Sequence, residues 1–379
     1  MASIRILFHR SHLNPRAELF AEALVAEGHE VTALCWDRKG SSNAANDAVP
    51  CTRVSSPGLR VSMLNAFLVP ILYLQFVREL HGNETDVLFC GHVSLLPLAA
   101  VLGLSGTTVV YDVVDPRVED YSERDSMLAP LFSWTVKAIE HACLTVVDGI
   151  TVIDTSGDVV KERYEGFTDN LAVVYNVPKL KPPHDRVGTH DTIVYVGVLD
   201  DRKGVSALLE AFALVRQSQP DVELLFIGDS VDDTANRLRS RAAELGVRDA
   251  VEFAGRVDYA KVHESLGRGD VAAAPYQPVP MNRIVRWNAR KIPDYMNAAL
   301  PVVVPDFGGF PEIVETTECG VTVDTTDIEE LRDALGALLD DADQARHLGT
   351  NGRRAVAERY NWENEQSKVV DVIETALGD

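Results

Sequence analysis

Two lysines in the second half of the chain are candidate anion-binding groups. Lys203 follows an apolar strand pattern in VGVLDDRKG, and Lys291, in NARKIPDYM, is predicted in a helix on the same face as Asp294. Gly308 and Gly309 follow PVVVPDF and precede another helical turn. Two cations beside a glycine-lined helix N-terminus suit a diphosphate, and a carboxylate suits ribose hydroxyls. By spacing alone, each lysine taken singly is more often an ordinary solvated surface residue.

Several other kinds of site lack their sequence signals. No G-x-G-x-x-G follows the first strand and no G-x-x-x-x-G-K-[ST] occurs, so dinucleotide-dependent oxidoreductases and P-loop proteins lose their main support. The five cysteines are scattered without a C-x-x-C pair, which argues against a disulfide framework or a zinc site. The acids Asp341 and Asp343 fall at a predicted helix junction, so we interpret them as solvated and expect no metal.

Strand and helix patterns that position these residues alternate along the whole chain. The expected strands are 4–8, 30–36, 86–90, 107–114, 149–154, 192–199, 222–228, 251–255, 270–276 and 301–306. Repeated strand–helix units imply parallel, doubly wound α/β sheets, in which ligands bind at the carboxyl ends of the strands. A polar, proline-rich segment interrupts the alternation, so we expect two Rossmann-like domains, residues 1–176 and 192–358, joined by a linker, 177–191.

The charge balance is strongly acidic. The 379 residues carry 36 Lys and Arg against 57 Asp and Glu, a formal net charge of −21. This excess argues against a nucleic-acid partner, because such partners need clustered basic residues. Lysines number nine of the 36 basic residues. Acid-rich, lysine-poor composition is typical of a halophilic archaeon with a salt-loaded cytoplasm. An ordinary acidic enzyme from a GC-rich genome is the alternative.

One apolar stretch, residues 61–77, raises the question of a membrane. Polar residues and a proline interrupt it, so a span is not expected. A buried amphipathic helix on a sheet is the first interpretation, and contact with a membrane surface is the second. The N-terminus has no cleavable signal region, so we expect a cytoplasmic protein, peripheral at the plasma membrane if that helix touches lipid.

Four segments together resemble glycosyltransferase family 4 of the GT-B fold. They are 5–38 (RILFHRSHLNPRAELFAEALVAEGHEVTALCWDR), 195–204 (YVGVLDDRKG), 288–315 (NARKIPDYMNAALPVVVPDFGGFPEIVE) and 359–365 (RYNWENE). The resemblance implies two Rossmann-like domains facing a cleft, with the acceptor bound by the first and a nucleotide-sugar donor by the second. It also implies sugar transfer with retention of configuration, no required metal or other cofactor, and a C-terminal helix, 359–379, that packs back on the N-terminal domain.

The donor-binding positions of that family can be carried over residue by residue. Lys203 and Lys291 match the diphosphate cations, and Asp294 matches the ribose acid. The matches at the base turn and the phosphate turn are Gly255, Arg256, Val257, Gly308 and Gly309. Gly228 matches a glycine before the base site, although a simple packing role explains it equally well.

Two departures from the family pattern concern the same site. Val198 occupies a position that is usually basic, so Arg202 is the candidate to replace the missing phosphate contact. Arg286 stands eight residues before Asp294, where the family usually has an acid near the donor sugar. An arginine there suits an acidic sugar or phosphate binding, and a surface residue is the alternative.

Candidate catalytic groups lie in the first domain. The resemblance places a histidine where this chain has Val114, so the adjacent Asp115 is the leading candidate to orient or deprotonate the acceptor hydroxyl. A helix N-cap is its structural alternative. His92, after strand 86–90, is the second candidate. The first strand–helix loop adds His9, Arg10 and His12.

The sequence therefore favours a retaining hexosyltransferase that uses a UDP- or GDP-sugar and a lipid-linked or cell-surface glycan acceptor. Under the halophile interpretation, surface-layer or protein N-glycosylation is the natural setting. Two alternatives stay open: a nucleotide-sugar 2-epimerase of the same architecture, and a catalytically weak glycan-binding or partner subunit, suggested by Val198, Val114 and Arg286.

Overall fold

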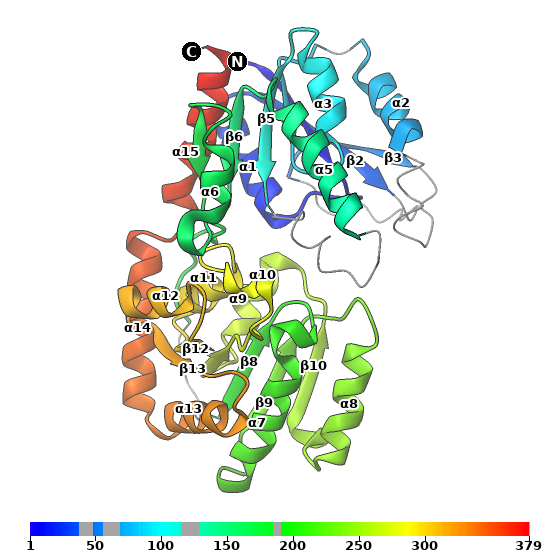
Figure 1. The fold of residues 1–379 in the computed structure, drawn as a ribbon. Helices are drawn as coiled ribbons and strands as arrows, with labels where there is room; N and C mark the ends of the chain where they lie inside the picture. The colour runs from blue at the N-terminus through cyan, green and yellow to red at the C-terminus, as the bar shows by residue number, and fades with distance from the viewer. Residues whose placement is uncertain (38–47, 56–68, 83, 115–128, 185–190, 379) are drawn as a thin grey trace. The chain divides into compact units, whose positions relative to one another are not determined.

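The computed structural model describes residues 1–37, 48–55, 69–82, 84–114, 129–184 and 191–378. The chain forms two compact units (Figure 1). The first unit comprises Met1–Asp154, Asp158–Val174 and Glu365–Asp379, and the second comprises Thr155–Gly157 and Tyr175–Asn364. Both are α/β units with parallel sheets, so the predicted pair of Rossmann-like domains is confirmed.

The first unit contains a seven-stranded parallel sheet of order β3-β2-β1-β4-β5-β6-β7. Its strands are β1 (Ser3–Phe8), β2 (Glu30–Asp37), β3 (Cys51–Ser55), β4 (Val87–Cys90), β5 (Thr108–Val113), β6 (Gly149–Val152) and β7 (Leu171–Val173). Strand β4 is a buried run of apolar residues, and β1 is one apart from Ser3 and Arg5, as expected for a sheet covered on both faces. The strand order reverses between β1 and β4, and such a switch point opens a crevice at the strand ends.

Helices cover this sheet, and several local signals set their ends. They are α1 (Pro15–Ala26), α2 (Val69–Leu80), α3 (Leu96–Gly103), α5 (Ala129–Leu144) and α6 (Val159–Tyr164). The short η2 (Ser156–Asp158, kinked at Gly157) precedes α6, and its first two residues belong to the second unit. Asn14 caps α1 by accepting a hydrogen bond from the Ala17 amide. Leu72 and Phe76 on α2 are fully buried in the core beneath α2, α3 and α5. No helix among the described residues is long and apolar enough to cross a membrane, and residues 61–68 lie outside the described ranges.

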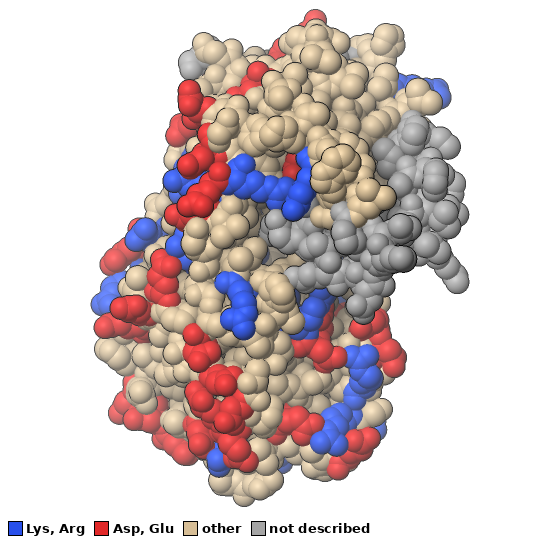
Figure 2. Space-filling view, viewed as in Figure 1, with Lys and Arg blue, Asp and Glu red and all other residues tan. Residues whose placement is uncertain are grey.

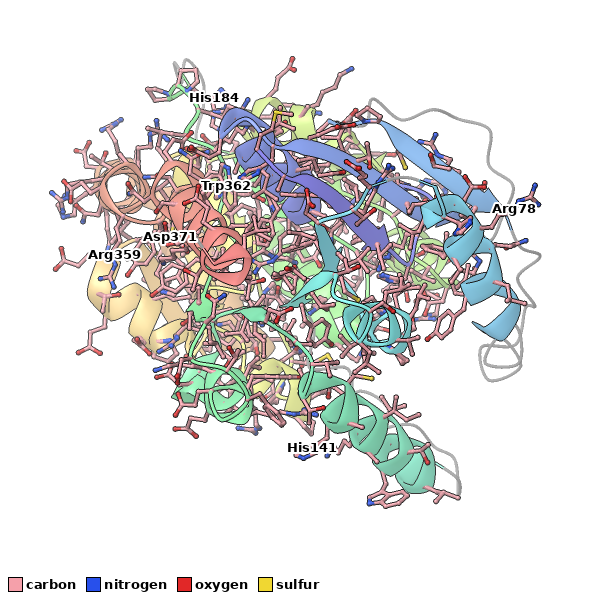
Figure 3. The ribbon with its side chains drawn as sticks, turned by 90° about the horizontal axis from the view of Figure 1, so that it is seen from above. Arg78, His141, His184, Arg359, Trp362 and Asp371 are labelled. Atoms are coloured by element: carbon pink, nitrogen blue, oxygen red, sulfur yellow. The ribbon has the colours of Figure 1, made fainter. Side chains whose placement is uncertain are left out.

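The C-terminal helix α15 (Trp362–Leu377) belongs to the first unit from Glu365 onward. Trp362 and Asp371 mark it in Figure 3. The Asn170 side chain donates a hydrogen bond to the Val372 carbonyl at 2.9 Å, which ties α15 to the β6–β7 edge of the sheet. At Gly149, an added Cβ would lie 2.8 Å from the Val372 side chain, so the close approach of this helix requires glycine there.

The second unit contains a six-stranded parallel sheet of order β10-β9-β8-β11-β12-β13. Its strands are β8 (Thr192–Val196), β9 (Glu223–Ile227), β10 (Val251–Gly255), β11 (Val271–Ala273), β12 (Val302–Pro305) and β13 (Gly320–Val323). Side chains alternate across the sheet, so Val194 and Val196 lie in one core cluster and Ile193 and Tyr195 in the other.

Two helical layers bury those clusters. The helices are α7 (Val205–Ser218), α8 (Thr234–Glu244), α9 (Tyr259–Leu266), α10 (Pro280–Arg283), α11 (Lys291–Asn297), α12 (Phe310–Thr317), α13 (Ile328–Asp340) and α14 (Ala342–Glu358), with the short 3₁₀ turns η3 (Asp201–Lys203) and η4 (Arg248–Ala250). The Asp341 side chain caps α14 by accepting from the Gln344 amide, and Asp343 pairs with Arg346, so both acids have local partners at the predicted helix junction.

Ala299, after α11, stores backbone strain. Its φ is +55°, a left-handed conformation that disfavours any residue with a Cβ by roughly 1–2 kcal/mol. Ala299→Gly should therefore raise the stability of the second unit by about 0.5–1 kcal/mol, net of the extra chain entropy of glycine. Scanning calorimetry at neutral pH measures the change.

The adjacent Ala298→Gly is the matched control. Ala298 has φ −80° and is fully buried, so glycine there should lower stability. Equal destabilisation by both substitutions would contradict the strain at Ala299.

Candidate functional site

The carboxyl end of β8 carries a tight loop that only glycine permits. Gly197 has φ +132° and Gly204 has φ +76°. A Cβ on Gly204 would lie 1.7 Å from the Pro275 carbonyl oxygen. Lys203 is the last residue of η3 and immediately precedes Gly204. Asp200 caps η3, because its side chain accepts a hydrogen bond from the Arg202 amide. The loop thus holds Lys203 at a fixed place beside the strand end.

Lys203 and Lys291 meet at one aromatic ring. Lys203 Nζ lies 4.4 Å from the centre of the Tyr276 ring, and Lys291 Nζ lies 5.0 Å from the same centre. Lys291 Nζ also lies 3.8 Å from the centre of the Tyr195 ring. Ring faces attract cations, so the two tyrosines hold both ammonium groups at the strand end. The structure therefore brings together the two lysines predicted from the sequence.

The ammonium group of Lys291 is buried and makes no hydrogen bond with any described residue. Burial lowers its pKa well below the usual lysine value, and the neighbouring charge of Lys203 lowers it further. A buried donor without an acceptor is costly, and an incoming anion would supply that acceptor. This makes Lys291 the strongest anion-binding candidate in the second unit.

Three glycines connect this cation to the base turn. A Cβ on Gly197 would lie 3.2 Å from Lys291 Nζ, and one on Gly228 would lie 1.9 Å from the Gly197 carbonyl oxygen. The Gly228 amide donates to the Gly255 carbonyl at 2.8 Å. Gly228 thus has a packing role, and Gly255, with φ +70°, ends β10 with open space beside it. Beyond Gly255, Arg256 is exposed and Val257 packs against the core.

Asp294 lies on α11, one turn beyond Lys291, and is buried. It accepts a hydrogen bond from the Tyr259 hydroxyl at 2.8 Å. Burial raises the pKa of Asp294 to about 6, although Arg290 and the Tyr259 hydroxyl oppose the shift. The Arg290 guanidinium lies 4.2 Å from the centre of the Tyr259 ring and donates from Nη1 to Asn176. Its Nε and Nη2 are buried and have no hydrogen-bond partner in the segments that the structure describes.

Arg290 and Tyr259 were not identified from the sequence. Arg290 stands four residues before Asp294, a helical spacing that could have flagged it. Tyr259 follows the GRVD turn and gives no such signal, because only the packing of α9 brings it to Asp294.

The glycine turn before α12 packs against Arg286. Gly308 has φ +65°, and a Cβ on Gly309 would lie 2.6 Å from the Arg286 Cβ. The Arg286 guanidinium donates to both carboxylate oxygens of Glu312 at 3.2 Å. Arg286 thus lies at the predicted phosphate turn. Its guanidinium is already paired with Glu312, in the first turn of α12.

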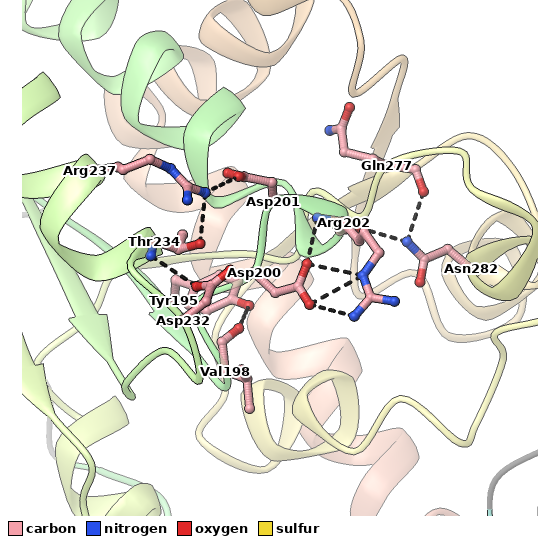
Figure 4. A network of polar contacts seen from close by, with 10 residues as sticks. All are labelled: Tyr195, Val198, Asp200, Asp201, Arg202, Asp232, Thr234, Arg237, Gln277 and Asn282. Carbon is pink, nitrogen blue, oxygen red and sulfur yellow. Dashed lines mark hydrogen bonds and ion pairs between the residues drawn. The ribbon is translucent and has the colours of Figure 1, made fainter. Parts of the chain in front are cut away.

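Arg202 forms a local ion pair. Its guanidinium lies 2.7 Å from the Asp200 carboxylate, and its side chain is half exposed (Figure 4). The Arg202 carbonyl accepts from the Asn282 side chain, which fixes the loop that carries Lys203. Val198 is 51% exposed beside this loop. A phosphate contact by Arg202 requires exchange of its Asp200 partner.

The first unit has its own small cavity, about 40 Å³, where β1, β4 and β5 end. His92 and His9 line it and stack at 3.7 Å between ring centres. The His92 Nδ1 lies 2.7 Å from the Ser94 hydroxyl, and Arg10 Nε donates to His9 at 3.4 Å. His92 therefore occupies a cavity at the strand ends. Asp115 lies outside the described residues.

Asp112, which lines this cavity, belongs to a buried ion pair. Arg16 Nη2 lies 3.0 Å from the Asp112 carboxylate, and Arg16 Nη1 donates to the Val174 carbonyl at 3.0 Å. Thr151 donates to the same carboxylate at 2.8 Å. Asp112 is fully engaged, so its role here is to position β5. Within the described ranges, no group of three or more His, Cys, Asp or Glu side chains is arranged to hold a metal ion.

Comparisons with known proteins define the class. The fold is that of the GT-B proteins: over its whole length the chain is similar to sucrose-phosphate synthase from Thermosynechococcus elongatus, with a TM-score of 0.72 at 20% identity over 100% of both chains. The structure of Anabaena HepE in complex with UDP-glucose gives a TM-score of 0.73 at 16% identity, over 99% of this chain and 100% of that one.

The second unit carries the more specific match. Residues 176–355 match the model of the family described as "Glycosyl transferases group 1".

Two mycobacterial mannosyltransferases are among the relatives with named activities. A GDP-mannose-dependent alpha-(1-6)-phosphatidylinositol monomannoside mannosyltransferase of Mycobacterium tuberculosis is 30% identical over 190 residues, 50% of this chain and 48% of that protein. A phosphatidyl-myo-inositol mannosyltransferase of Mycobacterium leprae is 34% identical over 186 residues, 48% and 46% of the two chains. The chain thus matches about half the length of these curated relatives.

Removing the buried charge of Lys291 should stabilise the empty protein. Lys291→Met keeps the aliphatic contacts with the two tyrosines and removes an unpartnered ammonium, so we expect a gain of about 1–3 kcal/mol at pH 7. Scanning calorimetry without ligand measures it. The exposed Lys261→Met should change stability by less than about 0.5 kcal/mol. A destabilised Lys291→Met protein would show that the ammonium is already satisfied.

Asp294 should make stability depend on pH. Its pKa is raised in the folded state, so between about pH 4 and 6 the native protein holds a proton that the unfolded chain releases. Stability therefore falls as pH rises through this window, by of order 2 kcal/mol, and Asp294→Asn should remove the fall. Urea titrations from pH 4 to 7.5 measure it.

Tyr259→Phe is the control for the cause of this shift. The Tyr259 hydroxyl lowers the Asp294 pKa, so its removal should extend the fall in stability to higher pH. Identical pH profiles for the wild type and Asp294→Asn would contradict a raised pKa.

Proposed function

We propose that this protein is a retaining glycosyltransferase that moves a hexose from a nucleotide-diphosphate sugar to an acceptor hydroxyl. The observation that carries the proposal is the buried ammonium of Lys291, which has no hydrogen-bond acceptor among the described residues and stands beside Lys203 at the end of β8. A diphosphate supplies acceptor atoms for the Lys291 ammonium and negative charge beside both lysines.

The same pair suits the chemistry of transfer. As the bond between the sugar and the diphosphate breaks, negative charge grows on the leaving oxygen. Lys203 and Lys291, already fixed by Tyr276 and Tyr195, stabilise that charge without reorganisation. In a front-face reaction the leaving diphosphate accepts the proton of the attacking hydroxyl, so the new bond forms on the face that the diphosphate leaves and configuration is retained.

Asp294 and Arg290 supply the groups for the ribose. An Asp294 carboxylate accepts hydrogen bonds from ribose hydroxyls, and the unsatisfied Nε and Nη2 of Arg290 lie on the same side of α11. The raised pKa of Asp294 means that donor binding below about pH 6 starts from a protonated acid, which accepts fewer hydrogen bonds. Donor affinity should therefore weaken on acidification.

GDP-mannose is the first donor to test, because the mycobacterial relative with 30% identity is named as GDP-mannose-dependent. UDP-sugars are the second. Metal independence is part of the proposal, since two lysines take the charge that a divalent ion would otherwise neutralise; full activity in EDTA is expected. The halophilic origin stays a prediction, so every assay is run in low and in molar KCl.

The acceptor is proposed to be lipid-linked or part of a cell-surface glycan, used at the cytoplasmic face of the membrane. Its hydroxyl would approach His92 in the first unit, with Asp115 as the alternative base. A role in surface-layer or protein N-glycosylation belongs to the halophile interpretation and stays a prediction with it.

The decisive experiment combines binding and turnover. Thermal shifts with GDP-, UDP-, dTDP- and ADP-sugars should show stabilisation by one nucleotide, through binding linkage. Release of the nucleoside diphosphate is then followed with a glycan or lipid acceptor extract. Lys203→Ala should lower turnover by about 100-fold or more with an unchanged melting temperature, on the scale seen when one stabilising donor is removed from a developing charge.

Lys261→Ala, an exposed lysine on α9, should keep full turnover. Nucleotide release without a new glycoside would favour a 2-epimerase or hydrolase instead. No stabilisation by any nucleotide sugar would overturn the donor site and favour a partner subunit.

A further inference from the structure

A second hollow on the first unit, about 300 Å³, lies between α5 and α6. Its lining is unusually basic for this acidic chain: Lys137 and His141 come from α5 and Arg163 from α6. In Figure 2, basic side chains cross the surface between the positions that α6 and α5 occupy in Figure 1. We call Lys137, His141 and Arg163 with their hollow the α5–α6 groove.

The one carboxylate that lines the α5–α6 groove is already neutralised. Glu140 is only 3% exposed, and its carboxylate lies 3.0 Å from Arg163 Nη2. It also accepts hydrogen bonds from the hydroxyls of Tyr111 at 3.1 Å and Tyr164 at 2.8 Å. The negative charge of Glu140 is therefore neutralised within the protein, and the net charge of the groove lining is positive.

Lys137 is the most accessible anion-binding group of the α5–α6 groove. It is exposed on α5, and it has no ion-pair partner in the part of the chain that the structure describes. His141 is oriented at the groove by an edge-to-face contact with Phe167 at 5.0 Å between ring centres. Lys137 and His141 are four residues apart, so their side chains project from the same helix face (His141 is labelled in Figure 3).

The α5–α6 groove adjoins the cavity that contains His92. Glu140 and Tyr164 line both hollows, so the groove and the cavity at the ends of β1, β4 and β5 are direct neighbours. A phosphate in the groove would therefore hold an attached polyol near His92, the candidate acceptor base.

We propose that the α5–α6 groove binds a phosphate group carried by the acceptor, through the Lys137 ammonium, the His141 imidazole and the Arg163 guanidinium. This inference rests on the proposed transfer reaction and names its acceptor class: a phosphorylated polyol or glycan. Lysine and arginine form short, charge-assisted hydrogen bonds with phosphate oxygens, and the fixed fork of Arg163 adds direction to the point charge of Lys137.

The phosphate has two chemical sources, a lipid headgroup and a soluble ester. Leu131 and Trp134, on the same helix α5, are 62% and 67% exposed, which makes the lipid source worth a separate arm. The probes are glycerol 3-phosphate against glycerol, and phosphatidylcholine vesicles with against without phosphatidic acid.

Binding is measured by calorimetry for the soluble probes and by co-sedimentation for vesicles. We expect the phosphate-bearing probe of one source to bind, and Lys137→Ala to weaken that binding about tenfold or more, the scale of one lost hydrogen bond to a charged group. Lys161→Ala, an exposed lysine on α6 that pairs with Glu165, is the matched control and should bind as the wild type does. Arg163→Lys, which keeps the charge near Glu140, should give an intermediate loss.

Glycerol 3-phosphate binding that depends on Lys137 supports a soluble acceptor, and vesicle binding alone supports a lipid-borne one. If neither glycerol 3-phosphate nor vesicles bind, or if Lys137→Ala and Lys161→Ala weaken binding equally, the proposed phosphate site in the groove is wrong. Stabilisation of Lys137→Ala by the nucleotide sugar is recorded in parallel. This stabilisation should equal that of the wild type. It tests the donor site alone, so a wrong donor site can be distinguished from a wrong phosphate site in the groove.

Discussion

The ammonium of Lys291 is the constraint around which the end of the second sheet is built. It is buried between the rings of Tyr195 and Tyr276, and the backbone around it must stay small. A Cβ at Gly197 would crowd the ammonium, and a Cβ at Gly228 would strike Gly197 in turn. The strand ends, the tyrosines and the glycine loop thus enclose one charge for which the described part of the chain supplies no hydrogen-bond acceptor.

Burial acts on both ionisable groups of α11 in the direction that opposes their charge. It lowers the pKa of Lys291 and raises that of Asp294, so each group is poorly satisfied in the empty protein. Such strain is typical of sites that bind charged ligands, because a ligand that brings the missing partners recovers the lost solvation. A ligand with both anionic oxygens and hydroxyl groups would satisfy the two together, and the proposed nucleoside diphosphate has both.

The sequence predicts the parts of this arrangement that follow from local pattern. Alternating strands and helices indicate the two Rossmann-like units, and Lys203 and Lys291 follow from strand ends and motif resemblance. Tyr276 and Tyr195 could not be predicted as the lysine partners, because their contacts depend on the packing of β8, α11 and the segment after β11. The edge strands β3 and β7 were also missed: CTRVS mixes polar with apolar residues, and LAV is too short to show a period. Glu140 gave no signal, since its partners Tyr111, Tyr164 and Arg163 come from other elements.

The net charge of −21 has a different meaning once its distribution is known. The acids that line the first unit's hollows are neutralised, Asp112 by Arg16 and Glu140 by Arg163, while Lys137 projects without a partner among the described residues. The acidic surface repels anionic ligands at a distance, and salt screens that repulsion beyond a Debye length of about 10 Å at 0.1 M. Contacts with Lys137 or Lys291 act at less than half that distance and are screened much less. Rising salt should therefore weaken the long-range repulsion more than the local attraction, so an acidic chain with a few enclosed cations favours anionic ligands most where salt is high.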